Sequence, residues 1–252
     1  MKHDIIIIGA GLVGLATAYQ ALKKFPTLKI LVLEKENAVA QHQSGHNSGV
    51  IHSGIYYKPG SLKAKNCIEG YNSIINFSKE YGINYDLCGK IIVATSSEEL
   101  SALNNIYERG TENGLQGLKY LSREEFREIE PHCEGIKAIK VPQTGIIDYP
   151  GIANKVKELF VEMGGEILFN QKVISITEKN EGITVITSQN EFLTKKLISC
   201  AGLYSDKITK MTNDKNDVII IPFRGEYYKL KDEKKHLVNH LIYPVPDPNF
   251  PF

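Results

Sequence analysis

The sequence has no excess of positive or negative charge, and it has no closely spaced pair of cysteines. Its 252 residues include 30 Lys and Arg against 29 Asp and Glu, so the formal net charge is +1. That balance argues against a basic surface that holds nucleic acid, and we expect no nucleic-acid partner. The four cysteines, Cys67, Cys88, Cys133 and Cys200, are far apart and form no Cys-x-x-Cys motif. This spacing does not suggest a disulfide framework or a zinc ribbon.

The sequence also lacks a long hydrophobic run. The longest early apolar run, residues 5–8, is far shorter than the roughly 20 apolar residues that cross a bilayer. Three glycines follow within six residues, which does not fit the cleavage site of a signal peptide. We therefore expect a cytoplasmic protein, and peripheral attachment to the inner face of the cell membrane is compatible with this expectation.

The N-terminal pattern predicts one βαβ unit. The β-branched run at residues 5–8 is typical of a strand buried on both faces. Residues 12–24 have apolar side chains at helical spacing, and a second buried-strand pattern covers residues 29–33. Strand, glycine turn, helix and strand in this order predict an α/β fold class.

The remaining chain mixes helices with short strands. Apolar spacing predicts helices over residues 62–81 and 151–163 and a strand over residues 91–94. Turn residues separate three later strands, which predicts an antiparallel meander. The three strands cover residues 173–177, 183–187 and 192–199. Two more strands are expected at residues 218–221 and 226–230.

A complete G-x-G-x-x-G motif joins the first strand to the first helix. Gly9 permits the tight turn, Gly11 lets the backbone approach a pyrophosphate, and Gly14 lets the helix pack close to the strand. Glu34 ends the second strand about 20 residues later, where an acidic side chain accepts hydrogen bonds from a ribose. This context predicts a dinucleotide site. The alternative is a glycine-rich turn before an ordinary helix.

The motif alone does not separate NAD from FAD. A nicotinamide dehydrogenase is expected to continue the alternation of strands and helices through a six-stranded sheet. Here the alternation stops after one unit, and the sheet is completed only by the late meander and the strand that ends near residue 200. This arrangement favours FAD.

Several segments together resemble one known family. They are the glycine motif and residues 43–65, 198–203, 222–227 and 240–248. The chain resembles the FAD-dependent D-amino-acid oxidase superfamily, and most closely its L-2-hydroxyglutarate oxidase (dehydrogenase) group. Proteins of this family continue for well over a hundred further residues, and the chain ends on an apolar, proline-rich segment. We therefore expect either a fragment or truncated product, or a protein whose C-terminal half comes from elsewhere.

The resemblance implies a Rossmann-like FAD-binding domain with an inserted α+β substrate domain, incomplete at the C-terminus. Residues 1–85 and 145–215 are expected to form the FAD-binding domain. Residues 86–144 and 216–252 are expected to form a partial substrate or cap domain.

The resemblance also implies which residues hold FAD. They belong to the glycine motif, the end of the second strand, the irregular segment that follows it, and two later strands. The implied residues are Gly9, Ala10, Gly11, Leu12, Val13, Gly14, Glu34, Lys35, Ser44, Gly45, His46, Asn47, Ser48, Gly49, Val173, Ala201 and Gly202. For the last two, the alternative is a plain turn from strand to helix.

The implied reaction is hydride transfer from the alcohol carbon of L-2-hydroxyglutarate to the flavin, which gives 2-oxoglutarate. A histidine suits the hydroxyl proton because its ordinary pKa is ~6.5, and His46 and His52 are the candidates. Either ring can instead contact the flavin or bond locally. Arg224 is expected to grip a carboxylate with its planar guanidinium, the alternative being a structural ion pair. Tyr56 and Tyr243 are expected substrate contacts, although tyrosines at such positions often only pack.

The expected partners are a small 2-hydroxy dicarboxylate and an electron acceptor, either oxygen or a quinone pool. The alternatives are a flavin oxidoreductase of amines or glycerol 3-phosphate, and an inactive flavin-binding fragment. His42 and His46 are four residues apart but have no third ligand at a suitable distance, so no metal site is expected. Residues 45–49 do not form the G-x-S-x-G elbow of esterases.

Overall fold

The chain divides into two units in the computed structural model, which describes residues 2–212 and 217–247. The first unit consists of Met1–Ser48 and Tyr149–Gly225, and the second of Gly49–Asp148 and Glu226–Phe252. The chain therefore passes from one unit to the other three times. No helix in the two described ranges is long and apolar enough to cross a membrane.

A six-stranded sheet forms the first unit. Its order is β10 (Val173–Lys179), β11 (Gly182–Thr187), β12 (Glu191–Ser199), β1 (Lys2–Ile8), β2 (Ile30–Leu33) and β9 (Glu166–Leu168). Strand β1 runs parallel to both of its neighbours, with Ile6 opposite Leu31 of β2 and Leu197 of β12. The consecutive side chains of Ile6 and Ile7 are both fully buried. Both faces of the strand are therefore covered, which explains its unbroken apolar run.

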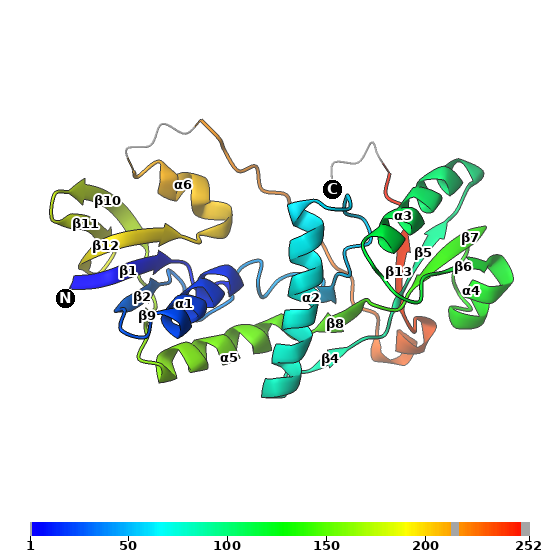
Figure 1. The fold of residues 1–252 in the computed structure, drawn as a ribbon, viewed down its shortest axis with the longest axis horizontal. Helices are drawn as coiled ribbons and strands as arrows, with labels where there is room; N and C mark the ends of the chain where they lie inside the picture. The colour runs from blue at the N-terminus through cyan, green and yellow to red at the C-terminus, as the bar shows by residue number, and fades with distance from the viewer. Residues whose placement is uncertain (1, 213–216, 248–252) are drawn as a thin grey trace. The chain divides into compact units, whose positions relative to one another are not determined.

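Helices cover the two faces of this sheet (Figure 1). Helices α1 (Leu12–Lys24) and α5 (Tyr149–Glu162) pack against each other, and α1 also contacts β1 and β2. The short helix α6 (Ser205–Thr209), preceded by the 3-10 turn η2 (Gly202–Tyr204), lies on the opposite face. Its Ile208 packs in one cluster with Ile6 and Ile8. The α/β fold, the helices over residues 12–24 and 62–81 and the antiparallel meander are as predicted from the sequence.

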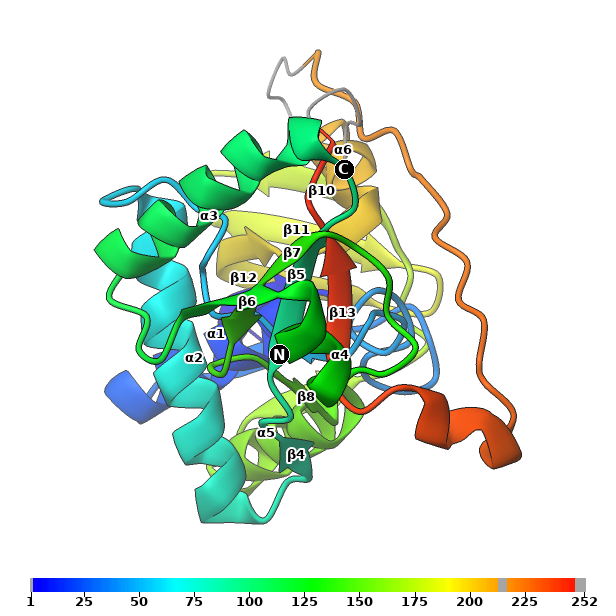
Figure 2. The same ribbon diagram turned by 90° about the vertical axis from the view of Figure 1, so that its right-hand side faces the viewer.

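A four-stranded sheet organises the second unit (Figure 2). Its order is β13 (Leu241–Pro244), β5 (Lys90–Ala94), β7 (Lys137–Val141) and β6 (Lys119–Ser122). Successive side chains of β5 point to opposite faces of the sheet, so they pack into two different hydrophobic clusters. Ile92 packs with Leu103 of α3 (Leu100–Glu112), whereas Ile91 packs with Phe126 of α4 (Arg123–Ile129).

Smaller elements complete the second unit. Strands β3 (Val50–Ile51), β8 (Gly145–Ile147) and β4 (Tyr85–Asp86) form a three-stranded sheet. Helix α2 (Leu62–Tyr81) has the predicted bounds: the Ser61 side chain caps its start, and Gly82 ends it in the left-handed conformation. Two 3-10 turns, η1 (Ser97–Glu99) and η3 (Asp232–Leu237), connect other elements.

A buried carboxylate anchors the last strand. Glu130, only 1% exposed, accepts hydrogen bonds from the backbone N–H groups of Asn239 and His240. Its Oε1 also lies 2.9 Å from Nδ1 of His240. These contacts fix the segment directly before β13, which pairs in parallel with β5. The chain end at residues 248–252 lies outside the described residues.

Two sequence-based expectations differ from the structure. The strands expected at residues 218–221 and 226–230 are absent from the described part of the chain, where residues 217–231 form no regular element. Their apolar side chains are exposed, for example Val218 at 68% and Tyr228 at 96%, so no neighbouring strand covers them. The boundaries between the units also lie elsewhere than at residues 85, 145 and 215. Residues 49–85 and 145–148 group with the second unit, and within it β3 and β4 both pair with β8.

Candidate functional site

The glycine turn after β1 has no room for side chains. Gly9 has φ of 103°, in the left-handed region, and a Cβ there would lie 2.5 Å from the carbonyl oxygen of Cys200. A Cβ on Gly14 would lie 1.9 Å from the carbonyl oxygen of Gly9. The turn, the first turn of α1 and the end of β12 are therefore packed backbone to backbone. Glycine is required at both positions for these steric reasons.

The N-terminus of α1 is shaped by a residue distant in sequence. Gly11 is the N-cap and has no side chain with which to cap the helix. Ser44 instead accepts a hydrogen bond from the Leu12 N–H at 3.0 Å. A Cβ on Gly11 would lie 3.1 Å from this Ser44 Oγ. The helix thus presents a glycine and a serine at its positive end, where backbone N–H groups favour anions.

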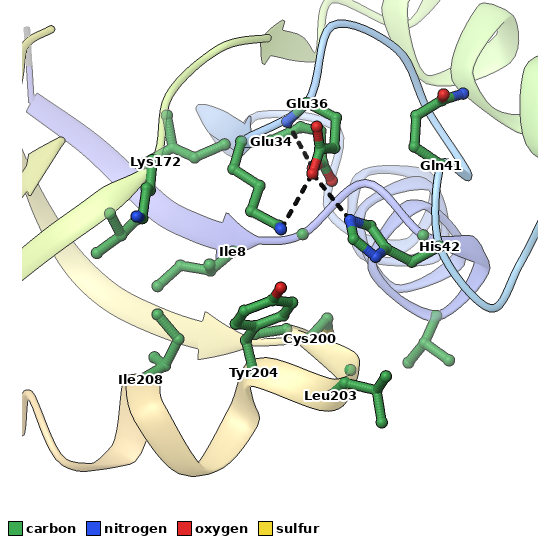
Figure 3. A pocket seen from close by; sticks show the side chains of 18 of the residues that line it. Ile8, Glu34, Glu36, Gln41, His42, Lys172, Cys200, Leu203, Tyr204 and Ile208 are labelled. Atoms are coloured by element: carbon green, nitrogen blue, oxygen red, sulfur yellow. Dashed lines mark hydrogen bonds and ion pairs between the residues drawn. The ribbon is translucent and has the colours of Figure 1, made fainter. Parts of the chain in front are cut away.

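A cavity of about 720 Å³ opens beside this turn, within the first unit (Figure 3). That volume is within the range of small-molecule and cofactor sites. Four segments line it: the glycine turn, the end of β2 with the loop after it, the start of β10, and the chain from Cys200 to Met211. The predicted cofactor residues among the lining are Gly9, Gly11, Val13, Glu34, Lys35, Ser44, Val173, Ala201 and Gly202.

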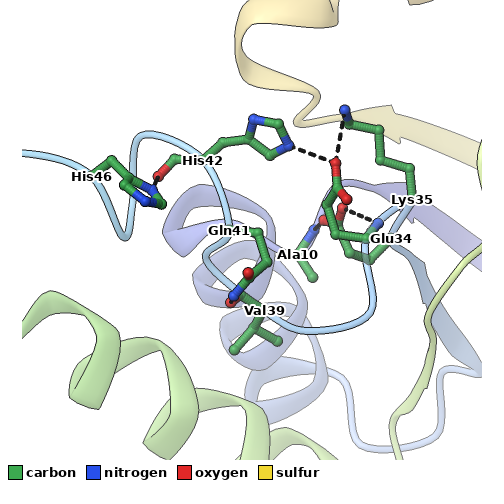
Figure 4. Close-up of polar contacts among 8 residues, drawn as sticks. Ala10, Glu34, Lys35, Val39, Gln41, His42 and His46 are labelled. Carbon is green, nitrogen blue, oxygen red and sulfur yellow. Dashed lines mark hydrogen bonds and ion pairs between the residues drawn. The ribbon is translucent and has the colours of Figure 1, made fainter. Parts of the chain in front are cut away.

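Glu34 ends β2 and is 7% exposed (Figure 4). Its Oε2 accepts a hydrogen bond from the Ala10 N–H at 2.7 Å, and its Oε1 accepts one from the Glu36 N–H at 3.0 Å. An ionised carboxylate has about four acceptor positions, so two remain for a ligand in the cavity. Glu34 therefore both fixes the glycine turn and offers acceptors to hydroxyl groups.

A charged cluster forms the part of the cavity wall next to Glu34. The Glu36 Oε1 lies 3.0 Å from Lys35 Nζ and 2.9 Å from His42 Nε2. The ring of Tyr204 lies 4.0 Å below the Lys35 ammonium. Burial lowers the pKa of Lys35, but hydrogen bonds to Glu36 and Tyr204 outweigh it, so the pKa is raised overall. Lys35 is therefore a permanent cation beside the cavity.

The rest of the segment predicted to bind cofactor forms a tight turn. A Cβ on Gly45 would lie 2.1 Å from the Ala40 carbonyl oxygen, and the N–H groups of Gly45 and His46 both donate to the His42 carbonyl. The Asn47 side chain donates to the carbonyl of Ser44 at 3.0 Å. Ser48 is exposed at the end of this turn, and Gly49 begins the second unit with φ of 70°.

The predicted catalytic and substrate residues belong to both units. His46 and Arg224 are exposed residues of the first unit, and the His46 ring bonds locally, with Nδ1 at 3.2 Å from the His42 carbonyl. His52, Tyr56 and Tyr243 belong to the second unit. His52 is also an exposed residue, but partial burial of its ring and the positive charge of Lys90 lower its pKa.

The sequence did not identify several polar residues of the cavity in the first unit, nor Lys90 in the second unit. Glu36, His42 and Tyr204 line the cavity, and each lies one or two positions from a predicted cofactor residue. That proximity was the signal available for them. Lys90 directly precedes an apolar strand, where a lysine is ordinarily an exposed strand end. No group of three potential metal-ligating side chains occurs within residues 2–212 and 217–247.

Known proteins similar to this chain include several that are named L-2-hydroxyglutarate dehydrogenase. An L-2-hydroxyglutarate dehydrogenase from Indibacter alkaliphilus is 53% identical over 253 residues, covering 100% of this chain and 63% of that protein. The mitochondrial L-2-hydroxyglutarate dehydrogenase of Homo sapiens is 45% identical, covering 100% of this chain and 57% of that protein. The chain therefore spans about three fifths of the length of these curated relatives.

A solved structure has the same fold. The dithionite-reduced L-α-glycerophosphate oxidase of Mycoplasma pneumoniae, with FAD bound, superposes with a TM-score of 0.83 at 26% sequence identity. The superposition covers 98% of this chain and 66% of that one. A family model described as FAD dependent oxidoreductase matches residues 4–252. Because this match takes in nearly the whole chain, the chain belongs to the FAD-dependent oxidoreductase family, as its motifs predicted.

Proposed function

We propose that the cavity of the first unit binds FAD. The residues present fit this cofactor: the turn at Gly9 and Gly14 excludes side chains, and Glu34 retains acceptors for ribose hydroxyls. The N-terminus of α1 with Ser44 would hold the pyrophosphate, and the backbone at Val173 the adenine. Family membership and the FAD bound to the glycerophosphate oxidase support this proposal.

Replacing Glu34 with Gln is expected to raise the dissociation constant of FAD by roughly ten- to a hundred-fold. The change removes charge-assisted hydrogen bonds, each about 1.5–3 kcal/mol. One oxygen remains for the buried Ala10 N–H, and the new amide NH2 faces the part-buried Glu36 N–H. Glu34→Ala is a poorer test because it leaves this buried N–H without an acceptor. Flavin fluorescence titration measures the change.

The matched control for this variant is Glu178→Gln, an exposed glutamate on β10 of the same unit. It should bind FAD as the wild type does. Equal affinity of Glu34→Gln and wild type would remove Glu34 from the cofactor site.

We further propose that the protein oxidises L-2-hydroxyglutarate to 2-oxoglutarate. The observation that carries this proposal is the 53% and 45% identity to L-2-hydroxyglutarate dehydrogenases across the whole chain. The alcohol carbon gives up a hydride and the hydroxyl gives up a proton, so one C=O bond forms. Bound FAD would supply the hydride acceptor, and oxygen or a quinone would be the final acceptor of the two electrons.

The chain's own residues would bind the substrate and move the proton. We assign proton acceptance to His52, because its lowered pKa keeps the ring neutral near pH 7. Tyr56 and Tyr243 would donate hydrogen bonds to the substrate, since burial raises the pKa of both phenols and keeps them protonated. Arg224 would pair with a carboxylate through its planar guanidinium.

Steady-state kinetics of the full-length protein loaded with FAD tests this function. An artificial dye serves as the electron acceptor, and L-2-hydroxyglutarate is compared with its D-enantiomer, sarcosine and glycerol 3-phosphate. We expect kcat/KM to be highest for L-2-hydroxyglutarate. A preference for glycerol 3-phosphate, the second candidate suggested by the similar oxidase structure, would overturn the proposal.

The electron acceptor can be tested with the same preparation. Reduction of a short-chain quinone without oxygen consumption would favour a dehydrogenase that works at a membrane surface. Oxygen consumption at a comparable rate would favour an oxidase.

A further inference from the structure

Lys90, the first residue of β5, is buried in the second unit. Only 1% of its surface is exposed. It lies opposite Leu241 of β13 and Val141 of β7, so strands flank it on both sides. Lysine is almost never fully buried without an opposite charge.

No carboxylate among the described residues neutralises this ammonium. Its Nζ lies 4.5 Å from the ring centre of Tyr56 and 4.8 Å from that of Tyr243. Its hydrogen-bond acceptor is the Tyr56 hydroxyl, at the long distance of 3.4 Å. By contrast, Lys119 in the same sheet is exposed and lies 3.0 Å from Glu125.

The other titratable groups around Lys90 are also not anionic. They are the His52 ring and the Cys67 thiol, which donates to the His52 carbonyl at 3.3 Å. Tyr227 interacts in turn with Tyr243. Burial raises the pKa of Cys67, Tyr56 and Tyr243, so these groups carry no negative charge near pH 7. The cluster therefore has an uncompensated positive charge.

This charge is costly to the fold, which argues for a use. Burying an ion without a partner destabilises a protein, and two aromatic faces offset only part of that destabilisation. An apolar side chain of the same length would fill the space without this cost. Tyr56 and Tyr243, whose rings surround the charge, and nearby His52 are residues proposed above to act on the substrate.

We infer that Lys90 is a positioning residue that supplies the positive charge of an anionic-substrate site through Tyr56 and Tyr243. This inference rests on the proposed function, which gives the substrate two carboxylates. The ammonium donates to the Tyr56 oxygen, so the phenolic hydrogen of Tyr56 points elsewhere and is available to a substrate carboxylate. The charge lies 4.5 and 4.8 Å from the two ring centres, where low dielectric strengthens its attraction for an anion.

Three variants test the inference in the full-length protein loaded with FAD. Lys90→Met removes the charge and keeps the length, and Lys90→Arg keeps the charge. The matched control is Lys137→Met, because Lys137 lies 4.2 Å over the Tyr120 ring in the same sheet and is half-buried. Calorimetry with glutarate, a dicarboxylate that cannot be oxidised at an alcohol, measures anion binding apart from turnover.

We expect Lys90→Met to weaken glutarate binding at least ten-fold, and to raise KM for L-2-hydroxyglutarate more than it lowers kcat. Lys90→Arg should retain most of the affinity, and Lys137→Met all of it. The melting temperature of Lys90→Met at pH 7 should equal or exceed that of wild type, whereas loss of a purely structural lysine would lower it. Unchanged glutarate affinity, or a lower melting temperature, would overturn the inference.

The wild-type protein provides a second test that needs no variant. Burial lowers the pKa of Lys90 to about 8 from 10.5. Below pH 8 the lysine is charged, and its burial destabilises the fold. That penalty disappears as the pH rises towards 10.5, where the unfolded lysine also loses its proton. Because Lys90 loses its positive charge as the pH rises through about 8, glutarate affinity should fall over the same range. A flat affinity profile between pH 7 and 9 would contradict the inference.

The outcomes separate this inference from the proposed function. A protein that binds glutarate through Lys90 but does not oxidise L-2-hydroxyglutarate refutes the function and keeps the anion site. A protein that oxidises L-2-hydroxyglutarate with the same KM before and after Lys90→Met keeps the function and refutes the role of Lys90.

Discussion

Replacing His52 with Asn is expected to lower kcat for L-2-hydroxyglutarate by roughly 10²–10⁴-fold, the usual contribution of a general base. Like His46, His52 is an exposed residue, but partial burial of its ring and the charge of Lys90 both lower its pKa, so the ring is unprotonated near pH 7. Asn can occupy much of the same space but cannot accept the proton. Stopped-flow measurement of flavin reduction in a single turnover isolates this step from reoxidation.

His46→Asn is the matched control for this prediction. His46 is exposed, and its ring bonds to the backbone of its own turn. We expect its replacement to change kcat less than ten-fold. A large loss of kcat with His46→Asn and a small one with His52→Asn would assign the role of proton acceptor to His46 instead.

The pH profile gives an independent readout of the same assignment. Because the pKa of His52 lies below 6.5, kcat/KM of the wild type should reach its plateau below neutral pH. Removing the charge of Lys90 should raise that pKa and move the acidic limb to higher pH. A shift to lower pH would be incompatible with His52 as the base.

Replacing Gly14 with Ala is expected to abolish measurable FAD binding and to destabilise the first unit by about 3 kcal/mol or more. The added Cβ would lie 1.9 Å from the Gly9 carbonyl oxygen, which is backbone and cannot rotate away. Helix α1 must therefore move off β1, and such overpacking typically costs about 1–3 kcal/mol or more. Flavin titration and thermal unfolding together measure both effects.

Gly70→Ala is the matched control for this variant. Gly70 is exposed within α2, and a Cβ there would meet nothing within 4 Å. The same substitution should leave FAD binding unchanged and stabilise the helix by roughly 0.5–1 kcal/mol. Tight FAD binding by Gly14→Ala would show that close packing at this position is not needed for the cofactor site.

The elements near the cofactor cavity could be predicted because their signals are local. The isoleucine run, the three glycines and Glu34 are close in sequence, and each has one physical reason to be where it is. The same holds for α2, whose capping serine and terminal glycine fix both ends. Where residues close in sequence determine the structure of a segment, the local sequence pattern is sufficient to predict that structure.

The features that could not be predicted depend on distant partners. Residues 218–221 have the β-branched composition of a strand, but no strand lies beside them in the described part of the chain. The boundary of the units at residue 49 depends on β3 and β8, which are too short to show a periodicity. Lys90 gives no signal because its burial is created by Tyr56 and Tyr243, 34 positions before it and about 150 after it.

The central strand of the first sheet has a consequence for how the chain is synthesised. Strand β1 obtains β2 as a neighbour early, but its other neighbour is β12, with Ile5 opposite Lys196. At roughly 5–20 residues per second, a ribosome needs about 10–40 seconds to make the intervening chain. During that interval one edge of an isoleucine-rich strand has no partner and can pair with another chain. The order of the strands thus leaves this edge of β1 open to pairing with other chains until β12 has been made.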